Sequence, residues 1–354
     1  MVYSNKKQNN KIYAWCCDIE SYRGEGILAI NFLKLLSDKY KNKVIVAESP
    51  DRIINFKNSK IISIKKKNKI KKINSDLFSN YLNPFIGIFK ILILKKNYSC
   101  RCYVNYLPLW NFLIFLLLPQ NIILGPITGS QYNNNVTSLN TFIRKYLLNF
   151  FYKLSVKILS HRKKNYLFST SLMKKYFKRK KNFYDFNLIN YDGQKKENKK
   201  KKFDMIFYYR RYSAHGHNIQ KKIILNLLDK KINVAIIGDK IFHENAKNFG
   251  IQNREKVLKL LTQSKFTLNE MTNFYSIYSL DALSGNVKIF YDRKTRPIKF
   301  YFPKNQYIEI NYHNIDKSIK TITSKIKNFK FKKFNYKFNI KKFIKNYDDY
   351  FNQF

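Results

Sequence analysis

Acidic residues are scarce in this sequence. Its 354 residues include 22 aspartates and glutamates against 69 lysines and arginines, a formal net charge of +47. That balance alone suggests nucleic acid or an anionic membrane as a partner. Lys, Asn, Ile, Phe and Tyr, the residues in excess, are all served by A/T-rich codons, so genome bias explains part of it. The lysines are also scattered, with dense runs only at 65–72 and 195–202, whereas nucleic-acid-binding proteins group them with aromatic platforms. A nucleic-acid partner is therefore not favoured.

Cysteine is scarce too. The chain has two close pairs, Cys16–Cys17 and Cys100–Cys102. Neither pair has the Cys-x-x-Cys spacing of a zinc site, and adjacent strand residues point to opposite faces. We therefore expect ordinary core thiols and no metal site.

Long apolar runs are missing as well. The longest, Leu107 to Leu118, is interrupted by Pro108 and Asn111 and falls short of the ~20 residues that span a bilayer. The polar N-terminus, MVYSNKKQNN, is followed by no signal peptide. These features predict a cytoplasmic protein. Surface lysines and the apolar helices expected at 85–94 and 109–118 suggest peripheral contact with an anionic membrane.

Enough apolar sequence remains for a packed core, because 45% of residues are hydrophobic, and the length suits two domains. In the first half, short β-branched runs alternate with longer helical patterns. Strands are expected at 11–17, 43–48, 60–64, 101–106, 121–127 and 165–170, and helices at 26–39, 79–94, 109–118, 137–162 and 171–178. This alternation indicates βα units and a parallel sheet.

A polar, lysine-rich stretch separates two such series. We expect a first Rossmann-like domain at 1–192, a linker at 193–202 and a second Rossmann-like domain at 203–330, followed by a helix at 331–354. The predicted class is α/β, with two doubly wound domains facing a cleft. Ligands of such sheets bind at the carboxyl ends of the strands.

The first glycine motif lies between the first strand and helix. Gly24-Glu25-Gly26-Ile27-Leu28-Ala29 fits a dinucleotide fingerprint, and Glu48 ends the second strand, where a ribose-binding acid would stand. Six residues, Asp18 to Arg23, separate the strand from Gly24, however, which is too loose for a pyrophosphate at the first turn. A glycine loop over a cleft is favoured, and an NAD or FAD site stays an alternative.

A second glycine motif follows a late strand of the first domain. Gly125-Pro126-Ile127-Thr128-Gly129 places small residues at a strand end, where Gly125 and Gly129 let a ligand approach the backbone. A plain turn explains the same residues.

A basic cluster follows the first strand of the second domain. Arg210 and Arg211 come at its carboxyl end, and His215 lies in the turn before the next helix. Arginine forks match phosphate oxygens, and a helix N-terminus adds its dipole. Two solvated arginines are the plainer interpretation.

An acidic helix follows a later strand. Glu270 and Asn273 precede it, and Asp281 is the acid on an otherwise apolar pattern. Facing a cleft, Asp281 can accept both hydroxyls of a ribose. A solvated helix face is the alternative.

The order and spacing of these motifs resemble GT-B glycosyltransferases over nearly the whole chain, especially the large retaining family of sugar-nucleotide-dependent enzymes (group 1, family 4 type) that build bacterial surface polysaccharides. The resemblance implies that the final helix packs back on the first domain. It implies an acceptor-side loop at Gly125, Thr128 and Gly129 in the first domain.

On the donor side, the resemblance implies diphosphate binding by Arg210, Arg211 and His215, with Gly24 and Gly26 over the phosphates. Two further positions, Asn273 and Asp281, match the family's paired acids, with Asp281 on the ribose; Glu270 lies nearby, out of register.

By this resemblance the protein transfers a hexose from a nucleotide-diphosphate sugar to a glycan or lipid-linked acceptor, with no cofactor besides the donor substrate. The catalytic base is not identified. The family's lysine is His215 here and its first acid is Asn273. These departures favour, as an alternative, a catalytically impaired GT-B partner protein.

Overall fold

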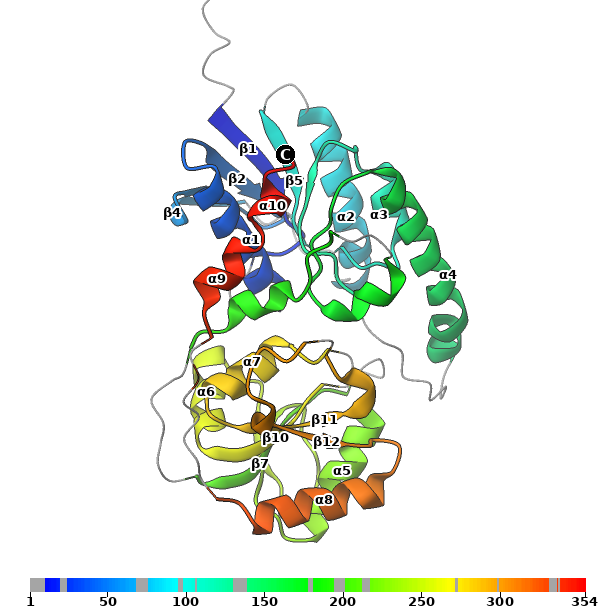
Figure 1. The fold of residues 1–354 in the computed structure, drawn as a ribbon, viewed down its shortest axis with the longest axis vertical. Coiled ribbons are helices and arrows are strands. Elements are labelled where there is room, and N and C mark those ends of the chain that lie inside the picture. Colours follow the sequence, from blue (N-terminus) through cyan, green and yellow to red (C-terminus); the bar gives the residue numbers. More distant parts are fainter. Residues whose placement is uncertain are drawn as a thin grey trace, which may run out of the picture. The chain divides into compact units, whose positions relative to one another are not determined.

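The computed structural model describes residues 10–19, 24–67, 76–94, 98–105, 107–129, 139–177, 181–193, 201–211, 217–270, 273–297, 299–330, 336 and 338–354. The chain forms two compact units (Figure 1). The first contains Met1–Gly129, Tyr146–Ile189 and Lys341–Phe354, and the second contains Ser130–Lys145 and Asn190–Ile340. Apart from the segment Ser130–Lys145, the chain passes to the second unit at 190, whereas the sequence places the domain boundary at 192, and it returns at 341.

The first unit is built on a six-stranded sheet with the order β4-β3-β2-β1-β5-β6. Its strands are β1 (Lys11–Trp15), β2 (Val44–Glu48), β3 (Arg52–Lys57), β4 (Lys60–Lys66), β5 (Cys100–Tyr103) and β6 (Ile123–Leu124). Strands β2, β1, β5 and β6 are parallel, and β3 and β4 add an antiparallel hairpin at one edge. The predicted strand at 165–170 is wrong, because Leu167 and Phe168 form only isolated bridges.

The helices of this part of the chain are α1 (Gly24–Lys39), α2 (Asp76–Ile93), α3 (Phe112–Leu117) and α4 (Leu139–His161), with 3-10 turns at Ser171–Tyr176 and Phe186–Asn190. Side chains of α2, α3 and the sheet bury a common core that includes Trp15, Ile88 and Phe115. None of the helices within the described ranges is both long and apolar enough to cross a bilayer.

The second unit carries a fully parallel sheet with the order β12-β11-β10-β7-β8-β9. Its strands are β7 (Phe203–Tyr209), β8 (Val234–Gly238), β9 (Lys247–Gly250), β10 (Ser264–Leu268), β11 (Lys288–Asp292) and β12 (Tyr307–Ile310). Its helices are α5 (His217–Asp229), α6 (Arg254–Thr262), α7 (Ile277–Ser284) and α8 (Ile315–Lys327), with 3-10 turns at Arg293–Thr295 and Lys304–Gln306. Apolar residues of β7, β8, α5 and α8 form its core, as a parallel sheet covered by helices requires.

The chain ends on the first unit, in α9 (Ile340–Lys345) and α10 (Asp348–Phe351). The buried Tyr350 hydroxyl donates to the carbonyl of Leu124, and the Tyr40 hydroxyl donates to the carbonyl of Phe351 at 3.3 Å. The predicted return of the C-terminal helices to the first domain, and the α/β class with two doubly wound sheets, are confirmed.

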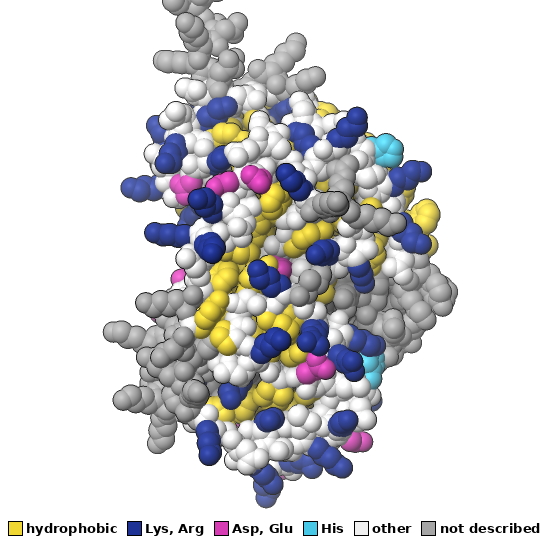
Figure 2. Space-filling view, viewed as in Figure 1, with side chains coloured by type: hydrophobic (Ala, Val, Ile, Leu, Met, Phe, Trp, Pro, Cys, Tyr) yellow, Lys and Arg dark blue, Asp and Glu magenta, His cyan; other side chains and the backbone are white. Residues whose placement is uncertain are grey.

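Both sheets have the strand order in which neighbours of the first strand lie on either side of it. The chain therefore reverses direction across the sheet between β1 and β5, and again between β7 and β10. The carboxyl ends of these strand pairs are the expected ligand positions. Lysine and arginine side chains are spread over the visible face of the molecule, as the scattered sequence pattern indicates (Figure 2).

Candidate functional site

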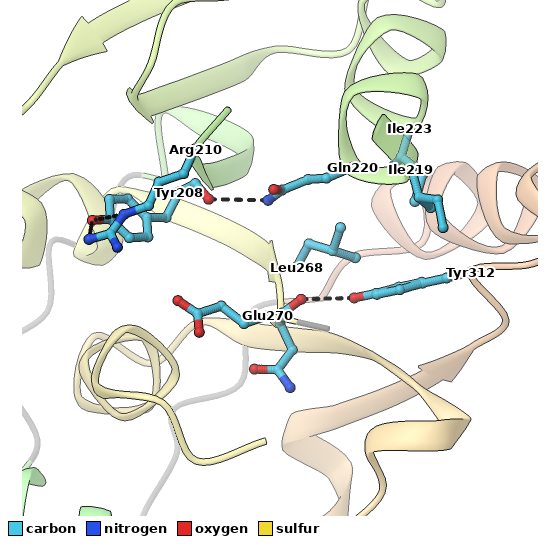
Figure 3. Close-up of a pocket in the computed structure, with 9 residues that line it drawn as sticks. Tyr208, Arg210, Ile219, Gln220, Ile223, Leu268, Glu270 and Tyr312 are labelled. Atoms are coloured by element: carbon cyan, nitrogen blue, oxygen red, sulfur yellow. Dashed lines mark hydrogen bonds between the residues drawn. The ribbon is translucent and has the colours of Figure 1, made fainter. Parts of the chain in front are cut away.

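A cavity of about 90 Å³ lies at the carboxyl ends of β7 and β10, where the second sheet reverses direction (Figure 3). The lining residues are Tyr208, Arg210, Ile219, Gln220, Ile223, Leu268, Asn269, Glu270 and Tyr312. They come from the two strand ends, from the first turns of α5 and from the segment after β12. The cavity therefore has the position that the topology of the second unit predicts for a ligand.

Arg210 is held beside this cavity by an aromatic neighbour. Its Nε donates to the Tyr208 hydroxyl at 2.6 Å, and its guanidinium carbon lies 4.6 Å from the centre of the Tyr208 ring. Tyr208 in turn stacks on Tyr278 of α7, with ring centres 5.5 Å apart. The exposed guanidinium thus has one fixed side and one side open to an anion.

Two neighbouring residues after β10 supply the polar groups of the opposite wall. Asn269 is 2% exposed; its Oδ1 accepts from the Ser279 hydroxyl, and its Nδ2 has no hydrogen-bond partner among the described residues. Burial raises the pKa of the Glu270 carboxyl, and the nearby charge of Arg210 partly opposes that rise. Arg210, Asn269 and Glu270 therefore line one cavity.

The walls of the cavity are braced by hydrogen bonds that leave those groups available. Gln220 Nε2 donates to the carbonyl of Tyr208 at 3.2 Å, and the Tyr312 hydroxyl donates to the carbonyl of Asn269 at 3.0 Å (Figure 3). Both bonds end on backbone oxygens at the strand ends. They tie α5 and the segment after β12 to β7 and β10.

The first unit has a second group of polar side chains, at the carboxyl ends of β1 and β5. Asn105 is 1% exposed, and its Nδ2 donates to the carbonyl of Asp18 at 2.7 Å. Its Oδ1 has no partner among the described residues. Glu25, in the first turn of α1, buries its Oε2 without a partner there. Burial, reinforced by the charge of Asp18, raises the pKa of Glu25 to about 7.

Glu48, which ends β2, is fully occupied. It accepts from the Tyr13 hydroxyl at 2.8 Å and forms ion pairs with Lys67 and Lys90. Burial alone would raise the pKa of Glu48, but the bonds from Lys67, Lys90 and Tyr13 outweigh it and lower that pKa. The acid that a dinucleotide site at Gly24 would need for its ribose therefore already has three partners.

Comparison with known proteins places this architecture. No protein-family model matches the chain, and no curated protein matches it. A sucrose-phosphate synthase from Thermosynechococcus elongatus is similar in structure, with a TM-score of 0.57 over 90% of each chain at 10% sequence identity. The chain has the GT-B fold.

Two other solved structures are similar with lower scores. One is a glycosyltransferase from Rickettsia africae, with a TM-score of 0.46, 12% identity and coverage of 89% of this chain and 88% of that one. The other is the lipopolysaccharide outer core galactosyltransferase WaaB, with a TM-score of 0.45, 12% identity and coverage of 97% of both chains.

The donor-side residues expected from the GT-B resemblance separate into distinct places. Arg210 and Glu270 line the cavity of the second unit. Arg211 does not: its backbone N–H donates to Asp239 at 2.6 Å and its guanidinium to the carbonyl of Lys240 at 3.1 Å. His215 lies outside the described residues.

Asp281 and Asn273 both have partners within the second unit. Asp281 is buried and accepts from Arg254, with Nη2 to Oδ1 at 2.7 Å and Nε to Oδ2 at 3.2 Å. Asn273 accepts from the backbone N–H of Tyr275 at 3.2 Å. Neither residue lines the cavity. The ion pair of Asp281 competes with the ribose contact that the sequence suggests, which stays a prediction.

The glycines of the first unit have structural reasons of their own. Gly24 and Gly26 lie in the first turn of α1, so the expected loop over a cleft is wrong at these two positions. A Cβ on Gly125 would lie 1.8 Å from the carbonyl oxygen of Val104, and one on Gly129 would lie 2.2 Å from Met173 Sδ. Thr128 bonds Leu107 and Leu109 through its backbone, at 2.9 and 2.8 Å. Close packing explains Gly125 and Gly129 without a ligand, and the acceptor-side role of this turn stays a prediction.

Sequence reasoning missed four polar residues at the two strand reversals: Glu25, Asn105, Tyr208 and Asn269. Asn105 lies two residues past β5 and Asn269 directly follows β10, so a polar residue just past a buried strand was the available signal. Glu25 stands inside the glycine motif itself. Tyr208 carries no such signal, because its role depends on Arg210 folding back over its ring.

Proposed function

We propose that this protein is a glycosyltransferase. It transfers a hexose from a nucleotide-diphosphate sugar to a glycan or lipid-linked acceptor, with retention of configuration, in bacterial surface polysaccharide synthesis at the cytoplasmic face of a membrane. The observation that carries the proposal is the cavity at β7 and β10, lined by Arg210, Asn269 and Glu270, where the exposed guanidinium of Arg210 offers donors to an anionic group. The GT-B fold supports it.

The donor is assigned to the second unit. Arg210 stabilises the charge that grows on the leaving diphosphate, because a fixed guanidinium beside a partly desolvated site needs little reorganisation. Arg211, at the same strand end, contributes charge from outside the cavity. A volume of about 90 Å³ holds only a fragment of a sugar nucleotide, whose complete site is several times larger. Glu270 is assigned to hydroxyl groups of the donor.

The acceptor is assigned to the first unit. The partnerless Oε2 of Glu25 and Oδ1 of Asn105 are hydrogen-bond acceptors, which suits the hydroxyl donors of a sugar. In the transfer, the acceptor oxygen bonds to the anomeric carbon as the bond from that carbon to the phosphate oxygen breaks. The hydroxyl proton passes to the leaving phosphate, so Glu25 binds and orients the acceptor.

Ligand binding tests the proposal. In thermal melting across a panel of UDP-, GDP- and ADP-sugars, at least one donor should raise the melting temperature. Arg210→Ala should abolish that rise, while Arg293→Ala, an exposed arginine with a weak 3.9 Å contact to Glu309, should leave it unchanged. If no nucleotide sugar and no free nucleoside diphosphate stabilises the protein, the enzyme proposal fails.

A second candidate is a catalytically impaired GT-B partner protein. The ion pair between Arg254 and Asp281 favours it, because an acid held in this way is not free to bind a ribose. Slow hydrolysis of the bound donor by the purified protein would exclude this candidate. An NAD or FAD site at Gly24–Ala29 has less support, since Glu48 is paired with Lys67 and Lys90.

A further inference from the structure

Three neighbouring helices of the first unit expose large hydrophobic side chains. We call this surface the α2–α3–α4 face. It comprises Leu82, Ile86, Phe89, Leu92 and Ile93 of α2, Leu113, Leu116 and Leu117 of α3, and Leu147 and Phe150 of α4. The exposed fractions reach 64% for Phe89, 59% for Leu116 and 60% for Phe150. Soluble monomers rarely expose so many large apolar side chains together.

Helix α2 shows that this exposure is patterned. Leu82, Ile86, Phe89 and Ile93 recur at helical spacing and form one stripe along its outer side. Ile88 and Ile91 are buried on its other side, against the sheet. The helix is therefore apolar on two faces, and the core accounts for only one of them.

Helices α2 and α3 and the part of α4 from Tyr146 onward are adjacent within the first unit. Figure 1 shows α2 and α3 next to each other and α4 beside α3. Phe112 of α3 stacks on Phe151 of α4, with ring centres 5.6 Å apart. Since the helices pack on one another, their exposed side chains contribute to a common surface.

The charge of this part of the chain identifies the partner. From Asp76 to Asp185 there is no acidic residue in between, while the same stretch carries 17 lysines and arginines. On α4, the exposed Lys153 and Lys157 follow Leu147 and Phe150 at helical spacing. An apolar surface carried by a stretch whose charged residues are all cations matches an anionic lipid bilayer, whose headgroups attract lysines and whose acyl boundary accepts Phe and Leu.

A second copy of the chain does not fit as well. Each molecule carries a formal charge of +47, and two such faces would bring cations against cations without an acid to pair them. We propose that the α2–α3–α4 face docks the protein on an anionic lipid bilayer. This extends the proposed function by naming the surface that meets the membrane, and its test needs no enzymatic activity.

Vesicle binding of the full chain tests the proposal. The protein should float with vesicles of phosphatidylcholine mixed with phosphatidylglycerol at low salt, and bind vesicles of phosphatidylcholine alone much more weakly. The triple variant Phe89→Ser, Leu116→Ser, Phe150→Ser should lower the partition coefficient by about tenfold or more. Because all three side chains are exposed, its melting temperature should be unchanged.

A matched control uses apolar residues of the second unit. Phe242 and Ile251 are 84% and 88% exposed, and Phe242→Ser with Ile251→Ser should leave vesicle binding at the wild-type level. The variant Lys153→Glu with Lys157→Glu keeps the apolar side chains. It should weaken binding at low salt, and salt should reduce its difference from wild type.

Several outcomes would overturn the proposal. One is wild-type binding by the triple variant, or no binding of the wild type to the anionic vesicles at low salt. Another is light scattering that finds the wild type dimeric and the triple variant monomeric, while both bind vesicles equally. The face would then join two copies of the chain. Should the triple variant unfold, each single variant should still lower the partition coefficient about twofold. Nucleotide-sugar binding should be unaffected throughout, so this proposal and the proposed function fail separately.

Discussion

The two sheets of this protein reverse direction in the same way, but the side chains at the two reversals are chemically opposite. Each has a buried asparagine with one unpaired amide atom among the described residues and a glutamate with a raised pKa. In the first unit the unpaired atoms are Oδ1 of Asn105, which is an acceptor, and Oε2 of Glu25, which is an acceptor when the carboxyl is ionised. In the second the unpaired amide atom is a donor, Nδ2 of Asn269, and Arg210 lines the same cavity as Asn269.

This difference teaches that one fold, used twice in a chain, can place different polar groups at the same point of its topology. An edge of acceptors suits sugar hydroxyls, which donate, and an edge of donors suits phosphate oxygens, which accept. The outer surfaces differ as well. The first unit exposes a large apolar face on α2, α3 and α4, whereas the large hydrophobic residues exposed in the described part of the second unit are Phe242 and Ile251.

The largest expected effect concerns Asp281 of the second unit, which is held in an ion pair with Arg254. Arg254→Ala removes the guanidinium that holds the buried Asp281 carboxylate. We expect the free energy of unfolding to fall by about 3 kcal/mol, because a buried charge loses its ion partner. Urea unfolding would measure it, with Arg293→Ala as the control. A variant as stable as wild type that no longer binds nucleotide would instead make Arg254 and Asp281 ligand-binding residues.

The next effect tests Arg210 at the cavity of the second unit. Arg210→Lys keeps a positive charge but loses the planar fork that rests on Tyr208. We expect the affinity for a nucleoside diphosphate to fall by about tenfold, since a guanidinium bonds two phosphate oxygens and an ammonium does not. Isothermal titration calorimetry would measure the affinity. An unchanged Kd would mean that the cavity in the second unit does not bind the diphosphate.

Glu25 tests the polar group of the first unit through the pH dependence of protein stability. Its folded-state pKa is raised to about 7 from 4.5, so the folded protein holds a proton that the unfolded chain has released. Its unfavourable contribution is absent below pH 4.5 and grows as the pH rises to about 7. Glu25→Gln should therefore stabilise the protein by about 1 kcal/mol at pH 8, after allowance for solvent screening, and by much less at pH 5. Melting curves at pH 8 and pH 5 provide the measurement. Equal stabilisation at the two pH values would contradict a raised pKa for Glu25.

The smallest expected effect distinguishes sugar from phosphate contacts at the cavity of the second unit. If Glu270 accepts from a ribose hydroxyl, Glu270→Gln should lower the affinity for the nucleotide by about threefold. The affinity for its 2′-deoxy form should stay nearly unchanged. The two nucleotides can be compared by competition against a fluorescent analogue. Equal weakening of both would assign Glu270 to another part of the donor.

The sequence predicted the architecture better than the site. Alternating apolar runs located most strands and helices, because burial against a sheet imposes a periodic pattern that local composition reveals. Arg210 and Glu270 were found because charged residues follow a buried strand. Asp281 was also expected to bind ligand, yet its partner Arg254 stands 27 positions earlier, on another helix, and no local pattern announces such a pair.

The sequence by itself determined that this chain folds into two α/β units and that charge would dominate its surface. Both properties follow from the composition and from the spacing of apolar residues along the chain. Neither depends on which distant residues meet in the folded protein. Only the tertiary structure decided which polar atoms remain unpaired. Whether Asn105, Asn269, Glu25 or Glu48 has a partner depends on side chains brought together from distant parts of the chain, as when Lys67 and Lys90 converge on Glu48. A functional site consists of the groups that such packing leaves unsatisfied, so it appears only once the packing is known.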